Sequence, residues 1–326
     1  MYKMYTQLYP PKPTLTEANL PNQSGKVFLV TGGNAGVGYE LVKILYCKGA
    51  KVYMAARSEA KASEAIESIK AISTSTPGEV KFLLLDLADL STIKASAETF
   101  SAQEEKLDVL WNNAGVSGIP SDQRSKQGNE MHMAINCLGP FLLTQLLLPK
   151  LELAARTAAK NTVRTIWTSS GAVDAIAPQG GVDMGELSNP SSDANRNYAA
   201  SKAGNWLLAS EFAKRVGGDG IVSLITNPGQ LRTKIWKGAT KFIQIMLSPT
   251  LHPPIYGAYT NIWAGLSKEI TVKDGGRYVI PWGRRFESVG TPRKDILNAL
   301  KTKEEGGSGR AAEFWTWCEE RTRKYA

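Results

Sequence analysis

Short apolar runs alternate with amphipathic stretches of helical period from residue 26 onward, and this alternation constrains the fold more than any other feature of the chain. A strand, a helix and a second strand in succession form a βαβ unit, whose strands lie parallel and whose helices cover the sheet. The runs with the length of strands are residues 26–31, 51–56, 80–86, 109–112, 163–169, 221–226 and 277–280. The sequence therefore predicts an α/β fold, a doubly wound sheet of about seven parallel strands with helices on both faces.

The chain divides into one core and two tails. Its 326 residues, of which 42% are hydrophobic, suffice for a single α/β core with extensions. Four prolines within residues 1–24 fix extended backbone and remove hydrogen-bond donors, which predicts an N-terminal extended arm outside the sheet. Three glycines within residues 306–309 precede an expected C-terminal helix, so residues 303–326 are predicted to form a helical tail. We expect one α/β domain over residues 25–302.

Charge and composition argue against several classes of protein. The formal net charge is +9, but the basic residues are scattered and only residues 321–324 form a dense patch, so nucleic-acid binding is not expected. Three widely spaced cysteines, Cys47, Cys137 and Cys318, lack the spacing of a metal site or a disulfide framework. The start of the chain is too polar for a secretory signal, and no run of about 18 apolar residues predicts a transmembrane segment. We expect a cytoplasmic protein, and peripheral membrane contact stays open.

A glycine-rich turn, TGGNAGVG at residues 31–38, joins the first expected strand to the first expected helix. Glycines let the backbone turn tightly and approach a pyrophosphate, whose charge is stabilised by the free N–H groups of the helix that follows. Such a turn can also be a plain strand-to-helix connection, but its position in the first βαβ unit favours a Rossmann dinucleotide site. The residues predicted to hold the cofactor are Gly32, Asn34, Gly36, Val37 and Gly38.

Further motifs follow this turn at suitable distances. The chain reads NNAG at residues 112–115, YAASK at residues 198–202 and PG at residues 228–229. Together with the glycine-rich turn, these motifs resemble the short-chain dehydrogenase/reductase family, in its single-domain branch rather than its sugar-epimerase branch. The resemblance covers roughly residues 25–285. It implies an enzyme that transfers a hydride between a nicotinamide cofactor and the carbon of an alcohol or carbonyl group.

The resemblance also implies four catalytic residues. Tyr198 and Lys202 are four positions apart and share one face of a helix, where a nearby ammonium is expected to lower the tyrosine pKa from about 10. Ser170 matches the serine that polarises the substrate oxygen, and its neighbour Ser169 is the other candidate. Asn136 matches the residue that sits at a helix kink and holds a water between Lys202 and solvent. Tyr198 is then the proton donor or acceptor beside the hydride transfer.

The same resemblance implies further contacts with the cofactor. Asp86 would accept a hydrogen bond from the adenine amino group, and Leu87 would pair through its backbone. Lys202 would bridge the hydroxyls of the nicotinamide ribose beside Tyr198. The contacts expected with the adenine ribose and the nicotinamide carboxamide are those of Asn113, Ala114, Gly115, Pro228, Gly229, Leu231 and Thr233.

The residues after the second expected strand predict NADP(H) rather than NAD(H). Enzymes that prefer NAD usually place Asp or Glu there to bind both ribose hydroxyls, and that carboxylate repels a 2′-phosphate. This chain has no acid at the strand end and continues with Arg57, Ser58 and Lys61. A guanidinium, a hydroxyl and an ammonium are suitable donors for phosphate oxygens.

Two segments without the strand pattern are expected to shape the substrate site. Residues 171–197 read as an insertion loop, similar to that of retinol-dehydrogenase-like, WW-domain-oxidoreductase-like and protochlorophyllide-reductase-like members, which often take large apolar substrates. Residues 232–266 are rich in Ile, Trp, Phe and Met and are expected to form a substrate lid, although they could simply pack on the core. His252 in this lid could only contact substrate, whereas His132 is expected to be a satisfied residue on a helix face. The expected substrate is a bulky hydrophobic ketone, aldehyde or alcohol, such as a polyketide-like or lipid-like secondary metabolite.

Two other functions remain open on the sequence. A Rossmann protein can bind NADP as a sensor or scaffold without turnover, although such proteins typically lose the tyrosine or the lysine. The same four residues can also serve dehydration or cyclisation. The family commonly forms dimers or tetramers, so a homodimer is one expected assembly, but monomers occur among members with a similar insertion.

Overall fold

The computed structural model describes residues 2–232, 250–285 and 293–326. Within them, one eight-stranded sheet has the order β3-β2-β1-β4-β5-β6-β7-β8. Seven strands are parallel, and the short β8 is antiparallel to β7. The strands are β1 Val27–Thr31, β2 Lys51–Ala56, β3 Glu79–Leu84, β4 Val109–Asn112, β5 Arg164–Thr168, β6 Val222–Thr226, β7 Tyr278–Ile280 and β8 Arg284–Arg285. The order reverses between β1 and β4, and ligands of such sheets bind beyond the carboxyl ends of the strands at this point.

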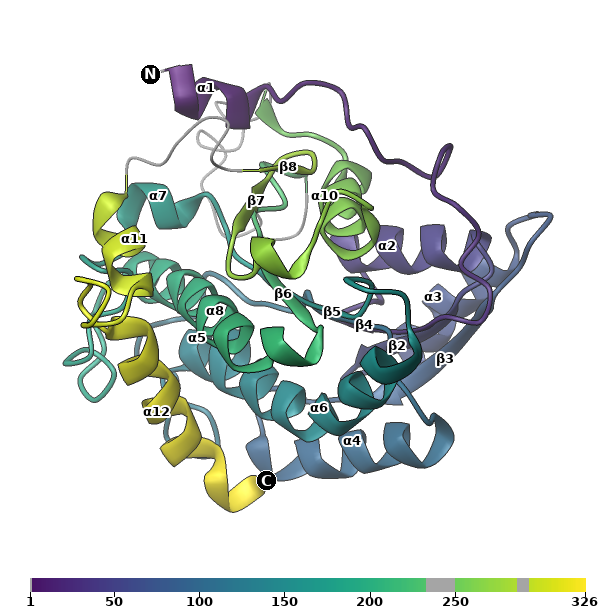
Figure 1. Cartoon of the computed structure of the whole chain (residues 1–326). Helices are drawn as coiled ribbons and strands as arrows, with labels where there is room; N and C mark the ends of the chain where they lie inside the picture. The colour runs from purple at the N-terminus through teal and green to yellow at the C-terminus, as the bar shows by residue number, and fades with distance from the viewer. Residues whose placement is uncertain (1, 233–249, 286–292) are drawn as a thin grey trace.

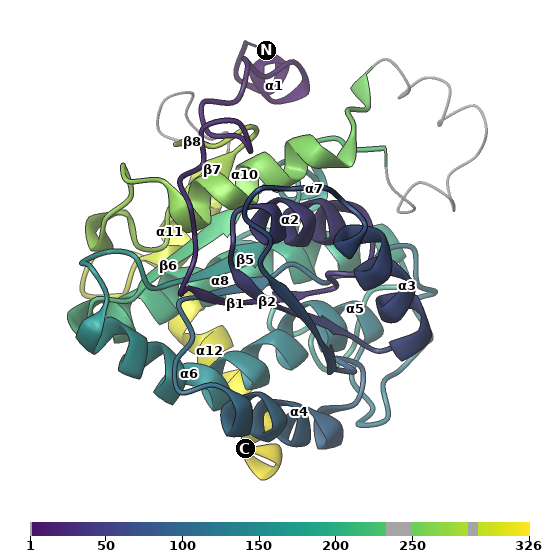
Figure 2. The same ribbon diagram turned by 90° about the vertical axis from the view of Figure 1, so that its right-hand side faces the viewer.

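Helices cover both faces of the sheet (Figures 1 and 2). One face packs against α2 Gly36–Cys47, α3 Glu59–Lys70 and α10 Pro254–Leu266. The other packs against α4 Leu90–Gln103, α6 Gly139–Thr157, α8 Ala194–Val216 and α12 Arg310–Thr322. In β1, Phe28 and Val30 join the first layer, whereas Val27 and Leu29 join the second, as the alternation of a strand requires. Both layers bury the sheet, which confirms the predicted Rossmann architecture.

The predicted strands correspond to β1 through β7, with ends that differ by one or two residues. The largest difference is at β3, which ends at Leu84, so Asp86 lies beyond the ladder. The sequence pattern did not predict β8, because its two residues, Arg284 and Arg285, are polar and too short to form an apolar run.

The N-terminal arm begins as a helix, which the sequence did not predict. Residues Tyr2–Leu8 form α1, and the cluster of prolines starts only at Pro10, directly after it. The extended backbone that proline imposes is therefore limited to the second half of the arm. That half is anchored to the body, because Leu20 is buried against α2 and the Gln23 N–H donates to the Lys48 carbonyl (2.7 Å). The arm contributes no strand to the sheet, and the prediction of an extended start was wrong.

The insertion between Ser170 and Tyr198 is more ordered than a loop. It contains the short helix α7 Ala172–Ile176, and α8 begins at Ala194, within its predicted limits. Residues from the C-terminal part of the chain hold it in place. Arg293 donates to the carbonyls of Val173 (2.8 Å) and Pro178 (2.7 Å), and Arg310 donates to the carbonyl of Val182 (2.5 Å). Because these partners are more than a hundred residues away, the local sequence could not indicate them.

The predicted lid is only partly described. Residues 233–249, including Thr233 and six of the nine Ile, Trp, Phe and Met residues of the predicted lid, lie outside the described residues. Residues 254–266 form α10, a buried helix packed on α2, so the lid prediction was wrong for this part. A side chain at Gly257 would clash with Leu231, and one at Gly265 would clash with the ring of Trp111. These two glycines let α10 approach the sheet closely, and α10 therefore belongs to the core.

One continuous helical stretch, Met131–Thr157, has the length and apolarity of a membrane span. It comprises α5 Met131–Met133, the π-helix η1 Ala134–Leu138 and α6, and 78% of its most apolar window is buried within the fold. Such burial is typical of a core helix, and its apolar residues pack beneath the sheet rather than facing outward.

Candidate active site

The glycine-rich turn packs closely against the turn after β4 because its glycines carry no side chains. Gly32 has φ +66°, and a Cβ there would lie 3.1 Å from the Cα of Ala114. A Cβ on Gly38 would lie 2.6 Å from the Nδ2 of Asn113. The helix α2 starts at Gly36, and its N-cap Ala35 provides no side-chain cap. The first N–H groups of α2 can therefore bind an anion, as a dinucleotide pyrophosphate requires.

The turn after β4 is tied to the turn after β1. Asn113 donates from Nδ2 to the Thr31 carbonyl (2.9 Å), and the Ala114 N–H donates to the Thr31 hydroxyl (2.9 Å). Asn113 thus holds the two strand ends together. Beside it, a Cβ on Gly115 would lie 2.7 Å from the Nζ of Lys202, so only glycine leaves space for the lysine. These contacts bring the first and fourth strands to the same edge as the predicted catalytic lysine.

The residues after β2 and β3, which were predicted to bind the adenosine part of the cofactor, differ in exposure and in hydrogen bonding. Arg57 and Lys61 are exposed, and in the part of the chain that the structure describes neither forms an ion pair. Ser58 is the N-cap of α3 and accepts from the Lys61 N–H (3.5 Å), so its hydroxyl already has a structural partner. Asp86 is half-buried and accepts from the Ala88 N–H through Oδ1 (2.9 Å), while Leu87 is buried. Among the described residues after β2 and β3, Arg57 and Lys61 are therefore the cations that an anionic group of a ligand could pair with.

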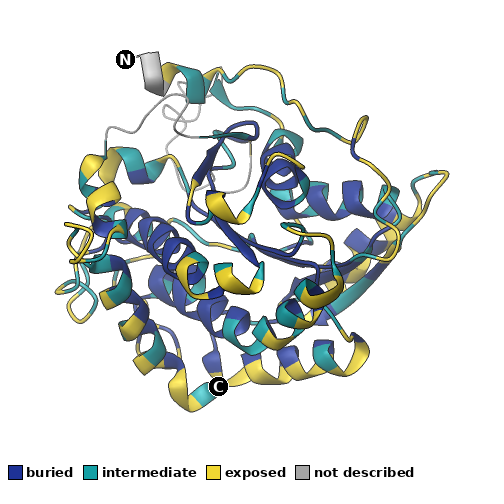
Figure 3. Cartoon of the chain, viewed as in Figure 1, coloured by how far each residue is buried: buried dark blue, intermediate teal, exposed yellow. Residues whose placement is uncertain are grey.

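Lys202 is buried in α8 and bonded to the end of β5. Its Nζ donates to the Thr168 carbonyl (3.1 Å), which also accepts from the Nδ2 of Asn205 (3.0 Å). Burial lowers the pKa of Lys202 to about 8, because the charged ammonium loses hydration there. Figure 3 shows how deeply the middle of α8 is buried. The lysine remains mostly protonated at neutral pH but releases its proton more readily than an exposed lysine.

The pKa of Tyr198 differs from the expectation. Burial raises it above the ordinary value, and a hydrogen bond with Ser170 opposes this shift only in part. Lys202 does not contribute, because its ammonium is bonded to Thr168 rather than placed against the phenol. The expected lowering of the tyrosine pKa by the lysine was therefore wrong for this ligand-free structure. The spacing of four predicted a shared helix face but not where the end of a long side chain lies.

The two serines after β5 have different environments. Ser170 is partly exposed, and its Oγ accepts from the Ala172 N–H (3.2 Å). Ser169 is buried and donates to the carbonyl of Lys202 (2.9 Å), which anchors α8 to the strand end. Of the two serines, only Ser170 is partly exposed and influences the pKa of Tyr198, so the geometry favours it over Ser169.

Asn136 lies in the π-helix η1. This departure from α-helical geometry occurs at the position where a helix kink was expected. Its Oδ1 accepts from the Val116 N–H (2.8 Å), and its Nδ2 donates to the Val116 carbonyl (3.0 Å) and to the Ser201 hydroxyl (2.9 Å). These bonds compensate for its poor helix propensity, as the sequence required. Asn136 thereby links the chain after β4 to α8, where Ser201 in turn donates to the Tyr198 carbonyl (2.7 Å).

The turn after β6 holds the residues predicted for the nicotinamide carboxamide. Gly229 has φ +89°, and a Cβ there would lie 2.7 Å from the ring of Trp282. Leu231 is buried and pairs with His252 in a parallel bridge. Pro228 and Leu231 meet Val37 of the glycine-rich turn around Gly257 of α10. The structure therefore brings this turn and the start of α2 together, although Thr233 falls outside the described residues.

The two histidines have the hydrogen bonds of structural residues. His132 is buried, contacts Glu130 Oε1 through Nδ1 (2.7 Å) and accepts from the Ile119 N–H at Nε2 (3.3 Å), as expected. Burial alone would raise the pKa of Glu130, but hydrogen bonds from His132 and nearby backbone hold it below its ordinary value. His252 Nε2 lies 3.0 Å from the carbonyl oxygen of Leu8. The expectation that His252 could only contact substrate was wrong, because it holds the N-terminal helix.

Several residues with hydrogen bonds around Ser170 were not predicted from the sequence. Tyr278 of β7 donates to the carbonyl of Ser170 (3.2 Å), and Asn227 accepts from the Gly229 N–H through Oδ1 (3.0 Å). Asn227 directly precedes Pro228 and Gly229, and this adjacency could have indicated it. No local pattern indicates Gln7 of α1, which contacts Asn227 across the chain.

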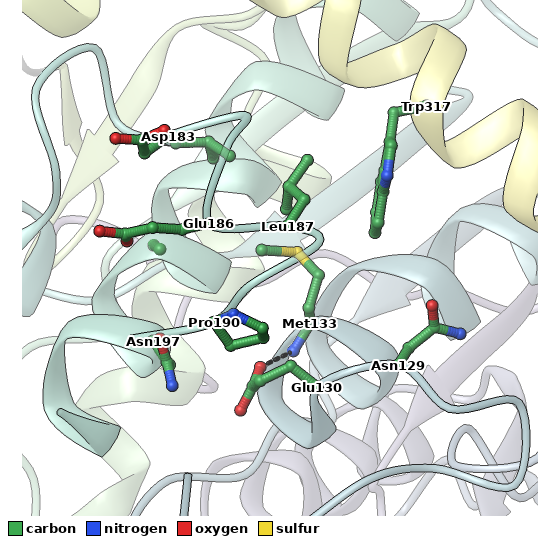
Figure 4. Close-up of a pocket in the computed structure, with 11 residues that line it drawn as sticks. Asn129, Glu130, Met133, Asp183, Glu186, Leu187, Pro190, Asn197 and Trp317 are labelled. Carbon is green, nitrogen blue, oxygen red and sulfur yellow. Dashed lines mark hydrogen bonds between the residues drawn. The ribbon is translucent and has the colours of Figure 1, made fainter. Parts of the chain in front are cut away.

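A small pocket of about 20 Å³ lies beside this site without including its predicted residues. Trp317 of α12 borders it on one side, and Leu187 and Pro190 of the insertion border the other (Figure 4). Met133 and Asn197 contribute from the helices between them. The pocket is therefore formed by the insertion and the C-terminal helix, away from the glycine-rich turn.

Known proteins resemble this chain over its full length. A family model described as short chain dehydrogenase matches residues 26–244. The short-chain dehydrogenase/reductase iacJ of Pestalotiopsis fici is 46% identical over 330 residues, covering 100% of this chain and 99% of the relative. A short-chain dehydrogenase/reductase of Phomopsis amygdali is 45% identical, covering 98% and 96% of the two chains.

Solved structures share the fold. A protein of Mycobacterium paratuberculosis has a TM-score of 0.68 and 26% identity, covering 95% of this chain and 97% of its own. RhlG of Pseudomonas aeruginosa, solved as an NADP active-site complex, has a TM-score of 0.52 and 24% identity, covering 89% and 92% of the two chains. The sheet order, the glycine-rich turn and these likenesses agree, and the chain belongs to the short-chain dehydrogenase/reductase family of nicotinamide-dependent oxidoreductases.

Proposed function

We propose that the chain is an NADPH-dependent oxidoreductase that interconverts a ketone or aldehyde and an alcohol on a bulky, largely hydrophobic small molecule. The observation that carries the proposal is the arrangement at the carboxyl end of β5. There the Ser170 hydroxyl is near enough to the Tyr198 phenol to oppose the rise of its pKa, and Lys202 is buried one helical turn further along α8. A sensor that only binds a dinucleotide has no need of this arrangement, and this supports turnover.

The residues of the site fit a nicotinamide dinucleotide. The uncapped start of α2 and the glycines at positions 32 and 38 form a surface that a pyrophosphate can approach closely. Tyr198, Lys202 and the turn at Pro228 would hold the nicotinamide end, and Asp86 would face the adenine. When bound, the cofactor supplies the hydride that is exchanged with the substrate carbon.

The protein's own contribution is to hold the substrate oxygen and move a proton to it. The Ser170 hydroxyl donates a hydrogen bond to that oxygen as negative charge develops. The phenol of Tyr198 donates its proton to the oxygen during reduction and accepts it during oxidation. Burial keeps the tyrosine pKa above its ordinary value, so the phenol carries at neutral pH the proton that it donates during reduction. Lys202, whose pKa burial lowers to about 8, can supply a proton to replace the one that Tyr198 has donated.

The preference for NADPH rests on the end of β2. Arg57 and Lys61 are exposed there, and no acidic residue directly follows the strand to repel a 2′-phosphate. Arg57 offers a planar pair of donors for the phosphate, and Lys61 adds charge one turn into α3. The hydroxyl of Ser58 serves the helix cap, so we assign phosphate recognition mainly to the two cations.

The substrate class rests on the surroundings of Gly229. The aromatic rings of His252, Tyr256 and Trp282 pack together there, with centroids of His252 and Trp282 at 5.0 Å and of Tyr256 and Trp282 also at 5.0 Å. Through Trp282 they pack against Gly229, in the turn proposed for the nicotinamide carboxamide. Such aromatic surroundings favour a large apolar substrate, including a secondary metabolite, over a small polar one.

The test is the oxidation of NADPH by the purified chain with a panel of small and large ketones and aldehydes. We expect turnover of large apolar carbonyl compounds, and mass spectrometry should show products that gain two hydrogen atoms. Tight NADPH binding without oxidation of any compound would indicate a sensor or scaffold, and loss of water from the substrate would indicate dehydration. A cytoplasmic location and a homodimer also remain proposals, of which size-exclusion chromatography can test the second.

A further inference from the structure

The N-terminal helix α1 contacts the carboxyl edge of the sheet although it belongs to no βαβ unit. Figures 1 and 2 both place it beyond β8, at the end of the molecule where α7 lies. Its backbone is held at two points. Arg284 of β8 donates to the carbonyl of Thr6 (2.7 Å), and His252, just before α10, contacts the carbonyl of Leu8 (3.0 Å). The helix is therefore fixed by two elements that are distant in sequence.

Between these two points, the side chain of Gln7 reaches the surroundings of Ser170. Its Oε1 accepts from the Nδ2 of Asn227 (3.0 Å), and its Nε2 lies 3.5 Å from the Oδ2 of Asp174. Asp174 lies in α7, one turn after Ser170, while Asn227 directly follows β6 and accepts from the Gly229 N–H. The Gln7 amide thus connects the turn after β5 with the turn after β6.

This connection lies next to Ser170. A Cβ on the neighbouring Gly171 would lie 3.6 Å from the Nδ2 of Asn227, within ordinary contact distance. The other oxygen of Asp174, Oδ1, is buried and has no hydrogen bond within the described part of the chain. Asp174 therefore depends on few partners, of which Gln7 is one. Burial raises the pKa of Asp174, and Gln7 opposes this rise.

We infer that Gln7 is a positioning residue of the active site, whose amide sets the distance between the Ser170 turn and the Asn227–Gly229 turn. The N-terminal helix is then part of the catalytic unit rather than an appendage. The inference rests on the proposed oxidoreductase function. An amide suits this role, because its oxygen can accept from Asn227 while its nitrogen donates to Asp174.

The test compares three variants with the wild type. Gln7→Met keeps the volume of the side chain but removes both hydrogen bonds, and Gln7→Ala removes volume as well. Tyr5→Phe, on the exposed side of the same helix, is the matched control, since the Tyr5 side chain is 58% exposed. We expect both Gln7 variants to lower kcat at least about fivefold, which is the effect of losing the neutral hydrogen bond with Asn227 alone, with an unchanged dissociation constant for NADPH. Tyr5→Phe should match the wild type.

A double-variant cycle distinguishes positioning from general destabilisation. Adding Gln7→Met to Asn227→Leu should cost little further activity, because the partner is already absent, whereas independent effects would multiply. Normal kcat in Gln7→Met, or restoration by Met of what Ala loses, would show that packing rather than the amide matters and would overturn the inference.

Hydrogen–deuterium exchange provides a measurement independent of turnover. In Gln7→Met, the amides of residues 170–176 and 227–231 should exchange several-fold faster, while those of β1 and β2 stay as in the wild type. If the wild type oxidises no NADPH, the proposed function fails, and the exchange result still decides whether Gln7 connects the two turns. Unchanged exchange in both segments would overturn the connection itself.

Discussion

Replacing Gly115 by alanine should disable the site without unfolding the protein. The new Cβ would lie 2.7 Å from the Nζ of Lys202 and 3.2 Å from the Oδ1 of Asn136, both closer than normal carbon contacts allow. The backbone of Gly115 has no positive φ, so alanine causes no strain of its own. Relief therefore requires the end of Lys202 to move away from the Thr168 carbonyl, where it is bonded at 3.1 Å.

The expected loss follows from that single displaced bond. A hydrogen bond from a charged donor contributes about 1.5 to 3 kcal/mol. If the reaction requires Lys202 at the Thr168 carbonyl, losing this energy lowers kcat/KM roughly 10- to 150-fold. The apparent melting temperature should fall only slightly, because the lysine end is flexible and can shift.

The assay is NADPH oxidation with the best substrate of the panel, combined with thermal unfolding. Gly217→Ala is the matched control, since a Cβ there meets nothing within 4 Å. Activity of Gly115→Ala within twofold of the control would refute the reasoning, because it would mean that Lys202 can leave Thr168 without consequence. A large fall in melting temperature would indicate a packing role instead.

The other predictions concern the cofactor, the tyrosine, the lysine and a core glycine. Tyr198→Phe should fold and bind NADPH but lose at least about a hundredfold in turnover, and near-normal turnover would reject the assignment. Arg57→Asp should lower kcat/KM for NADPH more than tenfold relative to NADH, and wild-type preference for NADH would contradict the phosphate site. Burial lowers the pKa of Lys202 to about 8, whereas in the unfolded chain it is about 10.5. Between these two pH values the unfolded chain binds more protons than the folded one, so this residue makes the free energy of unfolding rise with pH. Lys202→Met should remove that rise in urea unfolding at pH 7.5 and 9.5, and an equal change in both proteins would contradict it. Gly257→Val should destabilise the fold, because its side chain would overlap Leu231 and Val37 of the cofactor turn, and an unchanged melting temperature would show that α10 can move aside.

Much of this protein could be predicted from its sequence because the relevant signals are local. The strands are short apolar runs, and the helices between them have a regular period, so the parallel sheet required no long-range information. The glycine-rich turn is equally local, since Gly32 and Gly38 belong to one strand-to-helix connection. The spacing of Tyr198 and Lys202 also places them on one helix face, whatever surrounds the helix.

Only the tertiary structure decided what these residues contact. Ser169 and Ser170 are equivalent in the sequence, and burial against α8 separates their roles. Lys202 bonds to Thr168, 34 positions away, rather than standing against the Tyr198 phenol, so the tyrosine pKa rises where a fall was expected.

The N-terminal segment differs most from its prediction. Prolines correctly indicated chain outside the sheet, but Gln7 meets Asn227 across 220 positions, and His252 holds Leu8 across 244. No periodicity or motif encodes such pairs, because they depend on where the folded sheet places its strand ends. The sequence by itself therefore determined the elements and their order, while the surroundings of each side chain at the carboxyl edge were decided by packing between segments that are far apart in the chain.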